Sequence, residues 1–206
     1  MSKHGKIFIT CVPLENSKLS KKPINQGFKG GLILMTRILF VCHGNICRSP
    51  MAEFILKDMV RKNGMEREFE ICSAATSTEE IGNPVYPPAR RKLAEHGISC
   101  EGKRAVQMTK EDYQYYDYII AMDRYNLNNM KRFADNDDKN KISLMMDYTN
   151  RCGDVADPWY TGDFETVRRV SINPQGLLGW STSFIQYGLR AIGYLRLVLY
   201  TKKNPE

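Results

Sequence analysis

Four short apolar segments, separated by stretches of helical periodicity, are the feature that most constrains the fold of this chain. The segments carry the β-branched and aromatic residues typical of strands, and they are residues 36–42, 68–74, 117–122 and 142–146. Apolar residues recur at helical spacing between them, over residues 51–60, 87–96 and 125–134. Strands that alternate with helices predict an α/β fold, in which helices cover both faces of a parallel sheet. In such a sheet the functional site forms at the carboxyl ends of the strands.

The chain changes character at both ends of this alternating region, which covers residues 35–167. Residues 1–34 are rich in lysine, glycine and polar residues, and we predict a flexible extension, with Met35 as the true or an alternative start. Residues 168–206 form an atypical segment, because Pro174 and nearby glycines interrupt the helix expected after residue 163. An apolar stretch at residues 189–200 predicts a short helix that either packs on the domain or contacts a membrane surface or a partner.

Charge and cysteine usage exclude several classes of function. The formal net charge is +7, but the excess of lysine and arginine lies in residues 1–34 and 168–206, while residues 35–167 are mildly acidic, so no nucleic-acid partner is expected. No apolar run reaches the about 18 residues of a membrane span, and we expect no stable membrane insertion. The six cysteines include no Cys-x-x-Cys pair, and with only three histidines no metal site is expected. The N-terminal stretch has no readable signal peptide, which predicts a cytoplasmic, reduced protein.

The first apolar segment ends in a loop that runs from Cys42 to Arg48 and leads into a helical pattern. Backbone N–H groups in such a loop can point inward as an anion site, and the helix N-terminus adds partial positive charge. Gly44 would supply conformational freedom, and the Arg48 guanidinium can bind two oxygens of a tetrahedral oxyanion. The same positive field favours the thiolate of Cys42. A cysteine separated from an arginine by five residues also occurs by chance, but its position between a strand and a helix favours a nucleophile in a phosphate site.

A second motif, Asp157-Pro158-Trp159-Tyr160, lies far downstream on a predicted loop. Trp159 and Tyr160 are suited to form flat walls around an aryl phosphate, and Asp157 is suited to protonate its leaving oxygen. An Asp-Pro pair by itself is simply a turn signal. Its combination with the cysteine loop favours the catalytic interpretation.

Together these motifs resemble the low-molecular-weight protein tyrosine phosphatases over about residues 36–167. The matching stretches are VCHGNICRSPMAE, ICSAATS, PPARRKLAEHGI, TKEDYQYYDYIIAMDRYN and DPWYTGDFE. The resemblance implies a phosphatase domain at residues 35–167, built on a four-stranded parallel sheet flanked by helices. It implies hydrolysis of phosphotyrosine through a phosphocysteine intermediate, phosphotyrosine-containing proteins as partners, and no cofactor.

The resemblance also implies a role for each site residue. Catalysis is implied for the nucleophile Cys42, for Arg48 in phosphate and transition-state binding, for Asp157 as general acid and base, and for Ser49 as support of the thiolate. The phosphate-binding residues implied are His43, Gly44, Asn45, Ile46 and Cys47. Asn45 and Ser73 would brace the loop, and Trp159 and Tyr160 would form the substrate wall. Cys47 would form a reversible disulfide with Cys42 under oxidant, or would simply be a small residue beneath the loop.

Some features depart from the family pattern or leave alternatives open. Lys103 stands near a position where many members have a histidine that supports Asn45, and Glu79 stands where some members have an aromatic wall. The resemblance fades after Val167. Phosphoarginine phosphatases and arsenate reductases share the fold, but Ile46 and the two aromatic residues after Asp157-Pro158 favour phosphotyrosine. An inactive or poorly folding phosphate-binding relative is the remaining alternative, for which the unusual ends argue.

Overall fold

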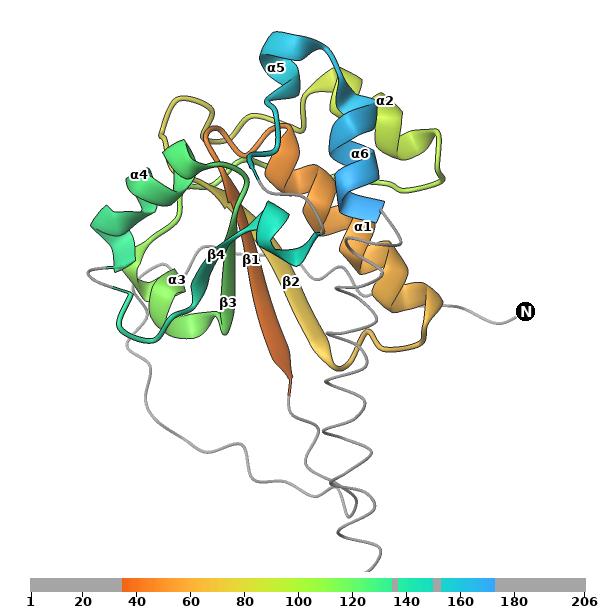
Figure 1. Cartoon of the computed structure of the whole chain (residues 1–206). Helices are drawn as coiled ribbons and strands as arrows, with labels where there is room; N and C mark the ends of the chain where they lie inside the picture. Colours follow the sequence, from red (N-terminus) through yellow and green to blue (C-terminus); the bar gives the residue numbers. More distant parts are fainter. Residues whose placement is uncertain (1–34, 135–136, 150–152, 173–206) are drawn as a thin grey trace, which may run out of the picture. The chain divides into compact units, whose positions relative to one another are not determined.

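The structure, a computed structural model, describes residues 35–134, 137–149 and 153–172. In chain order the elements are β1 (Thr36–Cys42), α1 (Arg48–Lys62), β2 (Phe69–Ala75), α2 (Pro87–Ala94), α3 (Lys110–Tyr115), β3 (Tyr118–Ala121), α4 (Arg124–Ala134), β4 (Ile142–Leu144), the 3-10 helix η1 (Met145–Tyr148), α5 (Pro158–Thr161) and α6 (Phe164–Ile172) (Figure 1).

The strands form one parallel sheet in the order β2-β1-β3-β4, which confirms the predicted four-stranded parallel sheet. Cys42 at the end of β1 is in register with Ala75 at the end of β2, and Val41 with Ala121 at the end of β3. Because these strands are parallel and in register, their carboxyl ends meet at one edge of the sheet. Whatever follows β1 therefore lies between the segments that follow β2 and β3.

Helices cover both faces of the sheet, as predicted (Figure 1). α1 packs on β1 and β2 and is itself covered by α2 and α6, whereas α4 packs on β3 and β4 and contacts α3. Side chains alternate along β1, and Ile38, Phe40 and Cys42 all belong to the buried cluster that contains Met51 and Ile55 of α1. The period of the strand therefore places Cys42 on the face that α1 covers.

Two local elements differ from the sequence expectation. The strand predicted over residues 142–146 ends at Leu144, because the chain turns into η1, where the Asp147 carboxylate accepts the Leu144 N–H at 2.8 Å. The helix α3 was not predicted, although its start carries a capping box: Thr109 and Asp112 each accept a hydrogen bond from the backbone N–H of the other. α3 is too short to show a clear apolar period.

The closing helix α6 extends beyond Val167, the residue after which the sequence resemblance to the family fades. It packs on α1 and α2, and the Val167 side chain is 1% exposed. The interruption expected from Pro174, the apolar stretch at residues 189–200 and the extension at residues 1–34 all lie outside the described residues. Within the described ranges, no helix has the length and apolar character needed to cross a bilayer.

We expect Val167→Ala to lower the free energy of unfolding by about 2 kcal/mol, because it removes two buried methyl groups and leaves a cavity between α6 and α1. Urea unfolding of the full chain measures this change. Arg169→Ala on the same helix is the control, since this side chain is 73% exposed and its ion pair with Glu165 contributes little. Equal unfolding midpoints for Val167→Ala and the unchanged chain would show that α6 does not stabilise the domain.

Candidate active site

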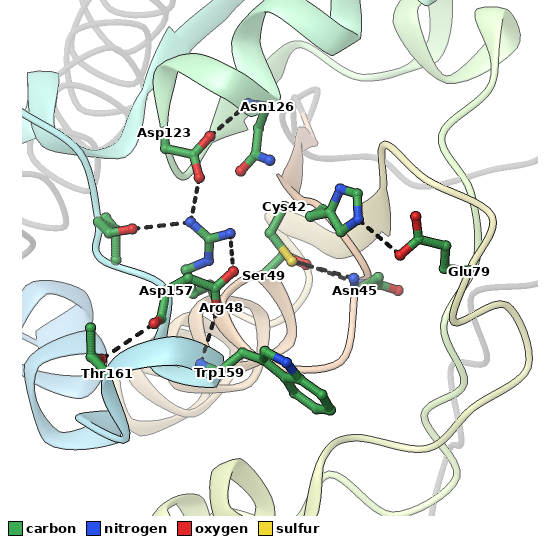
Figure 2. Close-up of polar contacts among 12 residues, drawn as sticks. Cys42, Asn45, Arg48, Ser49, Glu79, Asp123, Asn126, Asp157, Trp159 and Thr161 are labelled. Atoms are coloured by element: carbon green, nitrogen blue, oxygen red, sulfur yellow. Dashed lines mark hydrogen bonds and ion pairs between the residues drawn. The ribbon is translucent and has the colours of Figure 1, made fainter.

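The loop between β1 and α1 forms the floor of the candidate site (Figure 2). Cys42 ends β1, Arg48 begins α1, and the first turn of this 15-residue helix contains no acidic residue. The N-terminal partial charge of α1 is therefore left for an anion. The loop is also tied to the chain beyond it, because the Tyr86 N–H donates to the Ile46 carbonyl at 2.9 Å.

The left-handed residue of this loop is Asn45, with φ of 57°, rather than the predicted Gly44. The expectation that Gly44 supplies conformational freedom is therefore wrong. Space is tight at Gly44, because a Cβ atom there would lie 3.0 Å from Cγ of Glu80, and the Glu80 side chain would have to shift slightly. Asparagine tolerates the left-handed region better than most residues, since its short side chain makes local hydrogen bonds.

The sulfur of Cys42 lies among hydrogen-bond donors. The Ser49 hydroxyl oxygen is 3.0 Å from Sγ, and the Asn45 backbone N–H donates to Sγ at 3.3 Å. The Cys42 side chain is buried, so these donors act in a medium of low dielectric constant. These donors are placed to stabilise negative charge on the sulfur.

The Asn45 side chain connects the loop to neighbouring segments. Its Nδ2 donates to Ser73 Oγ at 2.8 Å and to Ser49 Oγ at 2.9 Å. Its Oδ1 accepts the Val106 N–H at 3.2 Å. The structure thus brings together Asn45, Ser49 and Ser73, which were singled out as loop supports.

Arg48 is buried behind the loop and is held by acidic side chains (Figure 2). Its Nη1 is 2.5 Å from Asp123 Oδ2 and donates to the Val155 carbonyl at 3.0 Å, while its Nη2 is 2.5 Å from Asp157 Oδ2. Burial alone would lower the pKa of Arg48, but the negative charges of Cys42, Asp157 and Asp123 raise it. Arg48 is therefore a fixed positive charge aimed between Cys42 and Asp157.

Asp123 is a site residue that the sequence pattern did not reveal. It follows β3, lies beside Arg48, and its Oδ1 accepts the Asn126 N–H at 2.6 Å at the start of α4. The signal was present, because an acidic residue directly follows a predicted strand. That strand becomes a neighbour of β1 only in the folded sheet.

Asp157 and the aromatic residues after it lie on the short helix α5. Asp157 caps this helix by accepting the Trp159 N–H at 3.0 Å with Oδ1, which leaves Oδ2 on Arg48. The Trp159 ring packs against Tyr86, with 4.8 Å between ring centroids. Tyr160 is 85% exposed. The structure thus places Trp159 against Tyr86, a residue that the sequence pattern did not single out, while Tyr160 is exposed to solvent.

The cysteines differ in chemical state. Cys42, Cys47 and Cys100 are free thiols, whereas Cys72 on β2 is disulfide-bonded, so the expectation of a fully reduced set is wrong at Cys72. Burial and the nearby charges of Cys42 and Asp157 raise the pKa of Cys47, which keeps it a neutral thiol beneath the loop. Within the described ranges, no group of three or more His, Cys, Asp or Glu side chains is arranged to hold a metal ion.

The two residues that depart from the family pattern both have charged partners. Glu79 Oε2 lies 3.1 Å from Nε2 of His43, the residue that follows Cys42. Lys103 does not contact Asn45. Its Nζ lies 2.9 Å from Glu53 Oε2 and donates to the Ser73 carbonyl at 2.9 Å.

These groups have the geometry for displacement at a tetrahedral oxyanion. The sulfur of Cys42 is placed to act as a nucleophile, and Arg48 and the helix N-terminus are placed to receive oxyanion charge. The Asp157 carboxyl group lies close enough to serve as a proton donor or acceptor. Ser49 and Asn45 orient the sulfur.

Comparisons with known proteins cover this same part of the chain. The family model "Low molecular weight phosphotyrosine protein phosphatase" matches residues 37–173. The chain is 42% identical over 135 residues to the low molecular weight protein-tyrosine-phosphatase YfkJ of Bacillus subtilis, covering 65% of this chain and 86% of that protein. It is 44% identical over 135 residues to the low molecular weight phosphotyrosine protein phosphatase of Gallus gallus, covering 63% and 85%. The crystal structure of YfkJ matches with a TM-score of 0.68 and 37% identity, covering 76% of this chain and 98% of that chain.

We expect Arg48→Lys to weaken the binding of inorganic phosphate about 10- to 100-fold, because lysine keeps the charge but cannot donate two parallel hydrogen bonds. Isothermal titration calorimetry measures the dissociation constant. Arg61→Lys at the other end of α1 is the matched control and should bind like the unchanged chain. Unaltered phosphate affinity in Arg48→Lys would remove Arg48 from the anion site.

Proposed function

The chain belongs to the low molecular weight phosphotyrosine protein phosphatase family, and we propose that it hydrolyses phosphotyrosine in proteins through a phosphocysteine intermediate. The observation that carries the proposal is the placement of Cys42 at the floor of an anion loop, with Arg48 linking that loop to Asp157. Few other reactions need a buried thiolate, a bidentate cation and a carboxyl group together.

The first step transfers the phosphoryl group to the enzyme. The Cys42 thiolate attacks phosphorus, so that a P–S bond forms while the P–O bond to the tyrosine oxygen breaks. Asp157 acts as the general acid and gives a proton to the departing phenolate oxygen. The Arg48 guanidinium binds the equatorial phosphoryl oxygens, whose charge is spread in the transition state. Tyrosine leaves and phosphocysteine remains.

The second step hydrolyses the intermediate. Asp157, now a carboxylate, accepts a proton from water as the water oxygen attacks phosphorus and the P–S bond breaks. The sulfur departs as a thiolate, and the Ser49 hydroxyl, 3.0 Å from Sγ, stabilises that charge by donating a hydrogen bond. Inorganic phosphate is released and the free enzyme is restored.

The shape of the site supports an aryl substrate. The Trp159–Tyr86 pair offers a flat surface beside Asp157, which suits the tyrosine ring. Ile46 and the aromatic residues after Pro158 support phosphotyrosine over phosphoarginine, as the sequence pattern already indicated. Asp157 also fits an oxygen leaving group that needs a proton.

Cys47 suits a protective role in the same loop. Peroxide would convert the Cys42 thiolate to a sulfenic acid, and the Cys47 thiol would then condense with it to a disulfide with loss of water. A later thiol reductant would restore both cysteines. The Cys42 nucleophile works as a reduced sulfur, so we also propose that the enzyme acts in the cytoplasm, where the Cys72 disulfide would have to persist against cellular reductants.

Hydrolysis of a phosphotyrosine peptide by the purified full chain tests the proposed function. We expect turnover that falls to background in Cys42→Ser, together with a phosphoprotein adduct on Cys42 in rapidly quenched samples. Hydrolysis of phosphoarginine but not phosphotyrosine would move the protein to the arginine phosphatases, and thiol-dependent reduction of arsenate would move it to the arsenate reductases. A folded protein that binds phosphate without any turnover would be an inactive relative.

We expect Asp157→Asn to reduce kcat on a phosphotyrosine peptide by about 10²- to 10⁴-fold, because the leaving oxygen then departs without a proton. The loss should be far smaller for aryl phosphates whose phenols are much more acidic than tyrosine, since these leave readily as anions. Steady-state kinetics on a series of aryl phosphates measure the trend. Asp154→Asn on the same segment is the control. Equal losses across the series would assign Asp157 a structural role instead.

A further inference from the structure

A cavity of about 600 Å³ lies beside the last turn of α2 and has no role in the reaction described above. Its walls come from α2, from the loop at residues 97–104 that follows this helix (Figure 1), and from Pro84 and Val85. We propose that this cavity is a second anion site, which binds a small organic anion through Arg90 and Arg104. The proposal goes beyond the proposed function, because none of the residues that line the cavity belongs to the phosphate loop or to α5.

The walls of the cavity are fixed by the backbone. Gly97 and Gly102 have φ of 71° and 80°, a region that glycine adopts without strain, and they turn the chain at both ends of the short loop between them. Arg104 forms an antiparallel bridge with Pro84, which attaches the end of this loop to the segment before α2. The two arginines are therefore held on connected segments, and the cavity is already formed when a ligand arrives.

The charged groups around the cavity leave an excess of positive charge. Three of the lining residues are basic and one, Glu101, is acidic. The ammonium of Lys103 is compensated by the Glu53 carboxylate at 2.9 Å. Arg90 and Arg104, in contrast, have no acidic partner among the described residues. Their guanidinium groups are therefore the cations that remain for a ligand.

A buried thiol in the same cavity shows how far the charge of Arg90 reaches. Cys100 lines the cavity and is 4% exposed. Burial raises the pKa of this thiol, and the positive charge of Arg90 offsets part of the rise. Cys100 therefore stays a neutral group within reach of the cation and does not compensate it.

The carboxyl end of α2 also borders the cavity, and the partial negative charge of a helix C-terminus would repel an anion. The last carbonyls of this helix are already hydrogen-bonded. Leu93 accepts the Ile98 N–H at 3.1 Å, and Ala94 accepts the Gly97 N–H at 2.9 Å. Glu101 is exposed, so water and salt screen its charge. Neither feature places a desolvated negative group against the two arginines.

The remaining walls favour an anion that carries an apolar body. Pro84, Ala94 and Ile98 contribute apolar surface, and a cavity of this volume is large enough for a small organic molecule. Guanidinium groups bind carboxylate or phosphoryl oxygens through parallel hydrogen bonds. The Ser99 hydroxyl accepts the Glu101 N–H at 3.4 Å and still has its own hydrogen to donate. An organic carboxylate or phosphate matches this combination.

Titration of the full chain with phenylphosphonate, followed by NMR of the backbone amides, tests the proposal. This probe joins a charged head to an apolar ring, and its P–C bond is not a bond that the proposed phosphatase reaction hydrolyses. Amides at residues 97–104 report on the cavity, whereas amides at residues 43–48 report on the phosphate loop. The two sites are therefore observed separately in one experiment.

We expect the amides at residues 97–104 to shift saturably, with a dissociation constant of about 0.1–1 mM for a ligand of this size. Arg90→Gln and Arg104→Gln should each weaken this binding about 5- to 10-fold, because each removes one of the two cations. Added salt should weaken it in the unchanged chain. Arg91→Gln is the matched control, since it removes the same charge from α2 at a residue that does not line the cavity.

Two further ligands separate the charged head from the apolar body. Inorganic phosphate, which has the charge alone, should shift the amides at residues 97–104 only at concentrations about 10-fold higher. Benzyl alcohol, which has the ring alone, should not shift them. Saturable binding of benzyl alcohol with the affinity of phenylphosphonate would show an apolar pocket and not an anion site.

A variant that fills the space tests the cavity itself. Ala94→Phe places a larger side chain at an exposed position on the wall and keeps both arginines. We expect it to remove the shifts at residues 97–104. Shifts confined to residues 43–48 in the unchanged chain, or equal losses of affinity in Arg91→Gln and Arg90→Gln, would overturn the proposal. Shifts at residues 97–104 with none at residues 43–48 would support the cavity and count against the phosphate loop of the proposed function.

Discussion

The hydrogen bonds of one buried asparagine hold the active-site loop in its shape. Asn45 has a left-handed backbone, which costs about 1–2 kcal/mol for a residue with a Cβ atom. Its backbone N–H reaches Cys42, and its amide reaches Ser49, Ser73 and the Val106 backbone. At about 0.5–1.5 kcal/mol each, these bonds offset the backbone strain. Asn45 therefore holds Cys42, Ser49 and Ser73 of the neighbouring strand β2 in place.

The charge of Arg48 is compensated before any substrate arrives. The Arg48 guanidinium is buried and shared between Asp123 and Asp157, so its desolvation is compensated by ion pairs. Its Nε has no acceptor among the described residues and remains available to an incoming oxyanion. When a substrate binds, Arg48 would exchange its contact with Asp157 for the phosphoryl oxygens.

Local pattern was enough to predict the strands, the loop and the Asp157 motif, because each is a short continuous stretch with its own periodicity or turn chemistry. Asp123, Tyr86 and the Lys103–Glu53 pair could not be predicted in this way. Each becomes part of the site only through the strand order or through packing between distant segments. The close neighbour of Gly44 could not be predicted for a similar reason. It is the Glu80 side chain, which comes from the segment after the neighbouring strand β2.

The order of the strands has a further consequence for folding. β1 pairs with β2 and β3, which follow it after long connections. The acidic groups bound to Arg48 come from the segment after β3 and from the start of α5. Parallel pairings between distant segments form slowly, because loop-closure entropy is lost before the contacts form. A half-folded chain would hold Cys42 without Asp123 or Asp157. After dilution from urea, catalysis should therefore return only when the whole sheet has formed. Its recovery should be slower than the appearance of helices.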